Sequence, residues 1–373
     1  MKGFKTLYVD ASRIKSGGGV QHLNEIIKSQ DLFYFDKIII FSYSALKNNL
    51  SKINNRIEFK TNLLINFNVF TCLIWQFLFL KREIKKSNSI LLTLDSTTLC
   101  NHKKNIIINQ DIIGFQKNSL NYSKGIDFIY NFLKYLIAKR AIEKSFGTIF
   151  TTDFAKSLLS KRISKKSIVI PHGVNSDIIS KKNYSISQKK YFEIVYVSPV
   201  LPYKNHIYII ESLNEIANKF NLKIHFVGGG DKTLTKKLKR KIDKYSLNEH
   251  FMFHPFLKHD EVIKLITNSD IALFTSSVEC FGITLLEYMR AAMPIICSKI
   301  SSLPETLKDS GIYIDLNNTN DLKEAVELFY NDESLRQKYG RLAYENSLKY
   351  SWECTANKTI KFVINKYEEA NMC

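Results

Sequence analysis

The sequence predicts an α/β protein built from two parallel, doubly wound sheets. Through most of its 373 residues, apolar runs short enough for strands alternate with amphipathic stretches long enough for helices. The alternation stops in a polar segment near the middle of the chain and then begins again. A chain of this length exceeds one ordinary hydrophobic core, so two domains are expected.

The first half of the chain has the strand–helix rhythm of a parallel sheet. Helices are expected at residues 21–27, after the loop Ser16-Gly17-Gly18-Gly19, and at residues 127–144. The expected strands are residues 4–10, 37–41, 89–94, 105–108, 147–151 and 167–170. This order predicts a sheet whose neighbouring strands are joined by crossover helices.

The segment Pro171-His172-Gly173-Val174-Asn175 breaks this rhythm, and the polar residues 180–190 are typical of an inter-domain linker. The boundary is therefore placed between residues 175 and 176. The pattern then restarts and ends with a helix at residues 352–369. The strands expected in this second half are residues 192–197, 223–227, 251–253, 271–274 and 295–297.

Positive charge is concentrated in the first half of the chain. Residues 1–175 contain 27 Lys and Arg against 11 Asp and Glu, a net charge of +16, while the remainder contains 27 against 24, a net charge of +3. Such an excess favours an anionic partner, which could be a phosphorylated acceptor, an acidic membrane surface or a nucleic acid. The sequence has no zinc, basic-zipper or RNP-type signature, so we expect no nucleic acid.

The cysteines and the first residues indicate a cytoplasmic protein. The six cysteines form no CxxC or CxxH pattern, which is typical of thiols in a reducing compartment. The chain starts with a short strand and no signal peptide is recognised.

The apolar residues 63–80 are expected to form a buried helix of the first domain. A helix lying in a membrane interface is the alternative, and a spanning helix is disfavoured by Asn66, Asn68 and Gln76.

The most informative segment is residues 276–287, where two carboxylates stand eight residues apart. Glu279 follows an apolar strand on a loop, and Glu287 falls about one turn into the next helix. Ligands of open α/β sheets bind in the crevice at such strand ends. The start of the helix offers unpaired N–H groups that suit a phosphate. The alternative is that both are solvated surface residues.

This segment, with Phe281-Gly282-Ile283 between the two carboxylates, resembles the E-x7-E motif of family 4 retaining glycosyltransferases. The resemblance implies the GT-B fold, with two Rossmann-like domains facing each other across a deep cleft. It implies an acceptor-binding domain at residues 1–175, joined by a C-terminal helix at 352–373, and a nucleotide-sugar-binding domain at 176–351. It implies that Glu279 contacts the donor sugar, that Glu287 contacts the ribose, and that Phe281, Gly282 and Ile283 line the donor site.

Two further segments resemble the same family. Lys204, in Ser198-Pro199-Val200-Leu201-Pro202-Tyr203-Lys204, matches the lysine that grips the donor diphosphate, although the usual Gly and Arg are replaced by Ser198 and Pro199. Gly228 and Gly230 match a turn that lets the backbone approach the nucleotide. Lysine would neutralise the phosphate that leaves with developing negative charge. A plain surface lysine is the alternative.

In the first domain, Gly18 and Gly19 resemble the family's N-terminal glycine loop, near the distal phosphate and the reacting centre. A simple turn is the alternative. Members of the family often place a catalytic His before an Asp near a central strand. Here Gln110 occupies the His position and Asp111 follows it, so these two residues are the first-domain catalytic candidates beside Glu279 and Lys204.

The resemblance implies a retaining, metal-independent hexosyltransferase. No D-x-D pattern or His/Asp cluster is present, so neither a metal nor a cofactor is expected beyond the nucleotide-sugar co-substrate. The expected acceptor is a lipid-linked glycan or oligosaccharide of bacterial O-antigen, lipopolysaccharide or capsule synthesis. The basic half is expected to hold the protein on the cytosolic face of the inner membrane. The alternatives are a sugar phosphorylase, a nucleotide-sugar epimerase or a basic nucleic-acid-binding protein.

Overall fold

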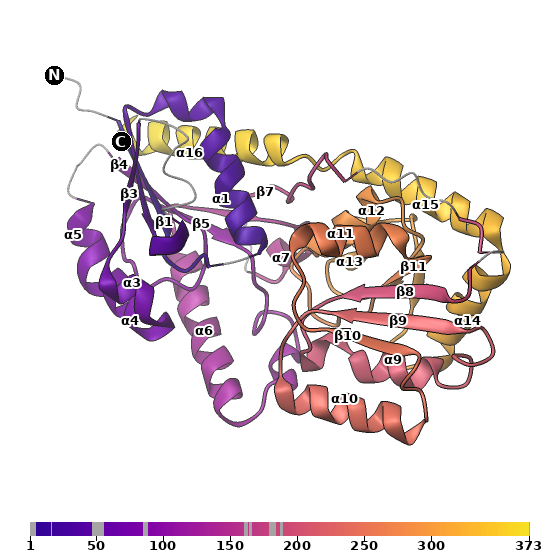
Figure 1. Ribbon diagram of the computed structural model, residues 1–373. Coiled ribbons are helices and arrows are strands. Elements are labelled where there is room, and N and C mark those ends of the chain that lie inside the picture. Colours follow the sequence, from indigo (N-terminus) through magenta and orange to yellow (C-terminus); the bar gives the residue numbers. More distant parts are fainter. Residues whose placement is uncertain are drawn as a thin grey trace. The chain divides into compact units, whose positions relative to one another are not determined.

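The chain folds into two compact units, each with its own parallel sheet. The computed structural model describes residues 5–15, 17–46, 56–84, 89–159, 163, 166–178, 184–186 and 189–372. One unit comprises Met1–Gly173 and Trp352–Cys373, and the other comprises Val174–Ser351 (Figure 1). Most of the expected linker at 180–190 lies outside the described residues. The predicted α/β class with two parallel sheets is confirmed.

The sheet of the first unit has the strand order β3-β2-β1-β4-β5-β6-β7, and every neighbouring pair is parallel. Its strands are β1 (Thr6–Ala11), β2 (Lys37–Ser42), β3 (Ile57–Lys60), β4 (Ser89–Thr93), β5 (Asn105–Asn109), β6 (Gly147–Phe150) and β7 (Ser167–Val169). The sequence analysis missed β3. This edge strand alternates apolar and charged residues and is only partly buried, so it lacks the continuous apolar run of a central parallel strand.

The two faces of this sheet bury different helices. Leu7 and Val9 share one core with α1 and α16, whereas Tyr8 faces the opposite core with Trp75. This alternation follows from the two-residue period of a strand. The helical segments of the unit are α1 (Gly18–Lys28), η1 (Gln30–Tyr34), α3 (Leu63–Phe67), α4 (Val69–Trp75), η2 (Gln76–Leu80), α5 (Lys81–Glu83), η3 (Ser119–Tyr122), α6 (Gly125–Lys144), α7 (Asp153–Ser157) and α16 (Trp352–Met372).

Residues 63–80 do not form the single buried helix that was expected. Asn68 ends α3 and caps α4, since its side chain accepts a hydrogen bond from the Thr71 N–H at 3.0 Å. Only one face of the segment is buried, and Phe67, Phe70 and Phe77 are largely exposed. Within the described ranges, no helix is both long and apolar enough to cross a membrane.

The sheet of the second unit has the order β10-β9-β8-β11-β12-β13 and is also parallel throughout. Its strands are β8 (Phe192–Val197), β9 (Leu222–Val227), β10 (Phe251–His254), β11 (Ile271–Phe274), β12 (Ile295–Ser298) and β13 (Ile312–Ile314). Its helical segments are η4 (Pro202–Lys204), α9 (His206–Leu213), α10 (Lys232–Lys244), α11 (His259–Asn268), α12 (Ile283–Arg290), α13 (Leu303–Leu307), α14 (Thr319–Asn331) and α15 (Glu333–Ser347). The three-residue strand β13 was not predicted.

Both sheets have a switch point, where the strand order reverses direction. It lies between β1 and β4 in the first unit and between β8 and β11 in the second. Ligands of open α/β sheets bind outside the carboxyl ends of the strands at such points. The loops that follow β1, β4, β8 and β11 are therefore where the fold itself places a binding site.

Candidate functional site

The loop after β8 carries Lys204, and two buried hydroxyl groups hold its backbone in place. The Tyr196 hydroxyl donates a hydrogen bond of 2.7 Å to the Lys204 carbonyl, and the Thr275 hydroxyl donates one of 3.1 Å to the same oxygen. Tyr196 belongs to β8, and Thr275 follows β11. The lysine is thus held between the two strands that flank the switch point.

The structure brings Lys204 and Glu279 together as an ion pair. Their side chains are 12% and 13% exposed, so water screens the pair only weakly. The backbone of Glu279 is fixed in turn, because the Ser301 and Ser302 hydroxyls donate hydrogen bonds of 2.7 and 2.8 Å to its carbonyl oxygen. Two residues 75 positions apart in sequence therefore form one preorganised charged centre.

Asn205 ties the loop of Lys204 to the loop of Glu279. Its backbone is left-handed, with φ of 58°, a conformation that Asn tolerates better than most residues. Its amide nitrogen donates hydrogen bonds of 2.7 Å to the Thr275 carbonyl and to the Ser277 hydroxyl. The sequence analysis did not predict this cross-link. The only signal for it in the sequence was that Asn205 directly follows the candidate Lys204.

Glu287 lies on α12, whose first residue is Ile283. The chain turns into this helix at Gly282, which has a φ of +88°. Phe281 is buried beside the turn. Burial raises the pKa of Glu287 to about 7. The exposed His259 is close to it, with Nε2 4.0 Å from a Glu287 carboxylate oxygen.

Gly228 and Gly230 are required by a close approach of two backbones. A Cβ on Gly228 would lie 2.6 Å from the Ser198 carbonyl oxygen, and one on Gly230 would lie 2.4 Å from the Val200 carbonyl oxygen. The turn hydrogen-bonds the same loop, with Val200 N–H donating to the Gly229 carbonyl at 2.9 Å. Both glycines thus support the segment that leads to Lys204.

In the first unit, the glycine loop and Gln110 are neighbours. Gly17 has a φ of +68° and precedes α1, which begins at Gly18. A Cβ on Gly19 would lie 3.9 Å from the Gln110 side-chain oxygen. The Gln110 amide donates a hydrogen bond of 3.1 Å to the Leu94 carbonyl, which orients it at the switch point between β1 and β4.

Asp111 follows Gln110, but both of its carboxylate oxygens are engaged. One accepts a hydrogen bond of 2.8 Å from the Ile113 N–H, and the other pairs with Lys134 of α6. The partner Lys134 was not singled out in the sequence, where it is one of several basic residues on a helix.

The sequence analysis also missed an ion pair between Arg13 and Asp95 at 2.9 Å. Arg13 follows β1 and Asp95 follows β4, so the pair lies at the first switch point. The Arg13 side chain is 9% exposed, and its Nη1 is buried without a hydrogen-bond partner. Their positions in the sequence could have indicated them, because each residue comes two positions after an apolar strand.

No metal centre is visible in the part of the chain that the structure describes. It contains no group of three or more His, Cys, Asp or Glu side chains that could hold an ion. Lys204 and Arg13 each place a positive charge at a switch point, paired with Glu279 and Asp95.

Residues 177–346, most of the second unit, match the family of glycosyl transferases group 1. The chain is also similar to the uncharacterized glycosyltransferase MJ1178 of Methanocaldococcus jannaschii. The two are 30% identical over 207 residues, which is 55% of this chain and 54% of the relative. The chain thus spans about half the length of this curated relative in the alignment.

Solved structures extend the likeness of fold to the whole chain. The Anabaena protein Alr3699/HepE in complex with UDP and glucose has a TM-score of 0.72 at 17% identity, covering 97% of this chain and 100% of that one. The lipopolysaccharide-biosynthesis glycosyltransferase WaaG has a TM-score of 0.73 at 14% identity, covering 96% and 99%. The fold of the whole chain is that of the GT-B glycosyltransferases, and the match to glycosyl transferases group 1 covers residues 177–346.

Proposed function

We propose that this protein is a retaining glycosyltransferase that moves a sugar from a nucleotide-sugar donor to a hydroxyl group of a glycan acceptor. The observation that carries the proposal is the Lys204–Glu279 pair, which is held at the switch point of the second sheet by the hydroxyls of Tyr196 and Ser301. It is supported by the match of this unit to the glycosyl transferases group 1 family.

The donor is a nucleoside diphosphate sugar, because the site combines a cation for phosphate with two carboxylates for hydroxyl groups. Lys204 binds the diphosphate, Glu279 contacts the sugar and Glu287 accepts hydrogen bonds from the ribose. Gly228, Gly230 and the Phe281–Ile283 turn shape the surroundings of the nucleotide. The HepE structures, which contain UDP or UDP-glucose, support this class of donor.

The reaction begins with cleavage of the bond between the anomeric carbon and the phosphate oxygen. The bonding electrons leave with the nucleoside diphosphate, and Lys204 stabilises the charge that develops there. The anomeric carbon becomes oxocarbenium-like. The acceptor oxygen then bonds to this carbon from the face that the phosphate leaves, and its proton passes to a phosphate oxygen. The configuration is retained, and no metal ion takes part.

The first unit supplies the acceptor side. Gly19 and Gln110 are neighbours at its switch point, where Arg13 has a buried Nη1 without a partner, and Gly18 and Asp111 adjoin them in sequence. The acceptor is a lipid-linked glycan of a bacterial surface polysaccharide, and the protein works at the cytosolic face of the inner membrane. The excess of positive charge in residues 1–175 and the likeness to WaaG support this assignment.

The donor site is tested by thermal shift with UDP-, GDP- and dTDP-sugars, using wild type and Glu287→Gln. One donor should stabilise the wild type, and it should do so more strongly as the pH rises. Since the pKa of Glu287 is about 7, the ionised fraction that accepts ribose hydrogen bonds, and with it the affinity, should rise about tenfold between pH 6 and pH 8. The donor diphosphate itself does not titrate in this range.

Glu287→Gln should bind the same donor weakly and without pH dependence. His259 is the titratable neighbour of Glu287, so His259→Gln serves as the control and should keep the pH dependence of the wild type. If no nucleotide sugar stabilises the wild type at any pH in this range, the proposal fails.

A further inference from the structure

A pocket of about 270 Å³ lies in the first unit, away from its switch point. It is formed by α6, by η2 and by the loop that leads into β5, and Asn105, the first residue of β5, lines it. Gln110 follows the opposite end of this strand. The two places are therefore separated by the length of β5, about 13 Å.

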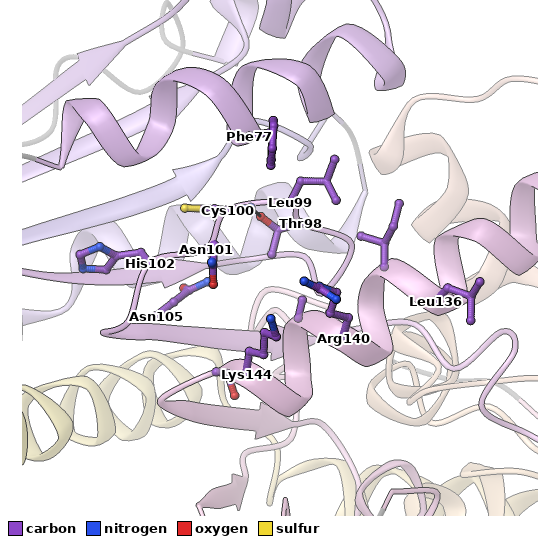
Figure 2. A pocket seen from close by; sticks show the side chains of 13 residues that line it. Phe77, Thr98, Leu99, Cys100, Asn101, His102, Asn105, Leu136, Arg140 and Lys144 are labelled. Carbon is purple, nitrogen blue, oxygen red and sulfur yellow. Dashed lines mark hydrogen bonds between the residues drawn. The ribbon is translucent and has the colours of Figure 1, made fainter.

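Two cationic side chains enter the pocket from one stripe of α6. Arg140 and Lys144 are four residues apart and line the pocket together with Leu136. Figure 2 shows them extending from the helix toward the loop that carries Thr98 and Asn101. Like charges at this helical spacing repel each other. None of the ion pairs among the described residues includes either of them, so no carboxylate there offsets the repulsion.

The last carbonyl groups of α6 have a cationic partner besides Lys144, the basic residue of its last turn. The C-terminal end of a helix attracts positive charge because its last carbonyl groups lack partners. In α6 that role belongs to Lys166, whose ammonium donates hydrogen bonds to the carbonyls of Glu143, at 2.9 Å, and Ser145. Arg140 and Lys144 are thus additional charges directed into a concave site.

Polar groups complete the pocket. The Thr93 hydroxyl donates a hydrogen bond of 2.8 Å to the Asn105 side-chain oxygen, which orients the amide. His102 also lines the pocket, and its Nε2 is buried without a hydrogen-bond partner. The volume lies just below the range of about 300–1,000 Å³ typical of sites for drug-sized ligands. A small anion that accepts several hydrogen bonds fits the donors of Arg140, Lys144 and the Asn105 amide.

The mouth of the pocket is apolar and exposed. Phe77 of η2 and Leu136 of α6 line it and are 65% and 43% exposed. The same two elements carry further exposed apolar side chains, which are Leu78, Phe79, Ile129, Phe132 and Leu133. A basic site surrounded by exposed aromatic and aliphatic side chains is the composition of a surface that binds anionic bilayers.

We propose that this pocket binds the phosphate of an anionic phospholipid headgroup through Arg140 and Lys144, while Phe77 and Leu136 at its mouth contact the acyl region of the bilayer. The proposal gives a site to the membrane association included in the proposed function. It rests on that part of the function and not on sugar transfer. A free phosphate shares the charge and hydrogen-bond acceptors of the headgroup, but it has no apolar part that could contact the mouth of the pocket.

The test is sedimentation of the full chain with vesicles of phosphatidylcholine, with and without phosphatidylglycerol. Replacing both cations, in Arg140→Gln/Lys144→Gln, should weaken binding to the anionic vesicles about 30-fold. Lys236→Gln/Lys237→Gln is the matched control, because it removes the same charge from exposed positions of α10. It should bind within about twofold of the wild type. Phe77→Ser should also weaken binding, and soluble glycerol phosphate should not compete with the vesicles.

If both double variants lost the same affinity for anionic vesicles, the effect would come from net charge alone, and the pocket would not be the lipid site. If glycerol phosphate bound as tightly as the vesicles, the phosphate recognised by the pocket would not be that of a lipid. Thermal shift with nucleotide sugars on the same preparations separates this proposal from the enzymatic one. Loss of vesicle binding only in Arg140→Gln/Lys144→Gln, without any donor response, would support the pocket and count against the transferase.

Discussion

Replacing Lys204 by Ala is expected to lower the rate of sugar transfer by about 10²–10³-fold, the effect of removing one preorganised group that stabilises developing negative charge. The loss should be larger than for any surface lysine, because Lys204 is 12% exposed and held in place by the Tyr196 and Thr275 hydroxyls. The measurement is the release of nucleoside diphosphate from the donor, normalised to the folded fraction.

The control is Lys189→Ala, which also breaks an ion pair of the second unit. Lys189 Nζ lies 2.7 Å from Asp270, a buried carboxylate just before the amino-terminal end of β11, at the opposite end of the strand from Lys204. Removing it should lower the stability of the unit but leave the turnover of the folded protein within about threefold of the wild type. If Lys204→Ala retained the same activity as this control, Lys204 would have no role in the transfer.

Replacing Gly230 by Ala is expected to destabilise the second unit by about 2–4 kcal/mol. The new Cβ would lie 2.4 Å from the Val200 carbonyl oxygen, in a residue whose φ is +156°. Val200 and Gly230 form a parallel bridge, and the Asp231 N–H donates a hydrogen bond of 2.9 Å to the Val200 carbonyl. These contacts cannot be kept, so the loop leading to Lys204 should move and donor binding should weaken.

Urea unfolding followed by circular dichroism gives the change in free energy, and hydrogen exchange of peptides from β8 and β9 locates it. Gly125→Ala is the matched control, because Gly125 also has a positive φ, +55°, but a Cβ there would meet nothing within 4 Å. It should lose about 1 kcal/mol from backbone strain alone. If both variants lost the same free energy of unfolding, the close contact with the Val200 carbonyl would not contribute to the cost of the substitution.

The central strands of both sheets could be predicted because they are buried on both faces. Runs such as Ile90–Leu92, Ile106–Ile108 and Ile295–Ile296 have no polar interruption, which is typical of parallel strands covered by helices. The edge strand β3 lacks such a run, because it alternates apolar and charged residues, and the edge strand β13 has only three residues, too few to stand out in the sequence. The single helix expected at residues 63–80 was wrong because Asn68 caps a new helix within the apolar stretch.

The second-unit candidates could be found from the sequence because each is followed or preceded by a recognisable turn. Lys204 and Glu279 come after strands, and the structure pairs them. Their supports could not be found in this way, since Asn205, Ser301 and Ser302 act through hydrogen bonds between distant loops. In the first unit, the Arg13–Asp95 pair depends on β1 and β4 being neighbours, which is a property of the strand order.

The central claim is that the protein transfers a sugar with retention of configuration. The most direct test is NMR of the product formed from the donor that thermal shift selects, with methanol supplying the acceptor hydroxyl. A methyl glycoside cannot interconvert between anomers, so its configuration records the reaction. We expect the anomer present in the nucleotide sugar. The opposite anomer, or a donor that binds but is never cleaved, would contradict the account.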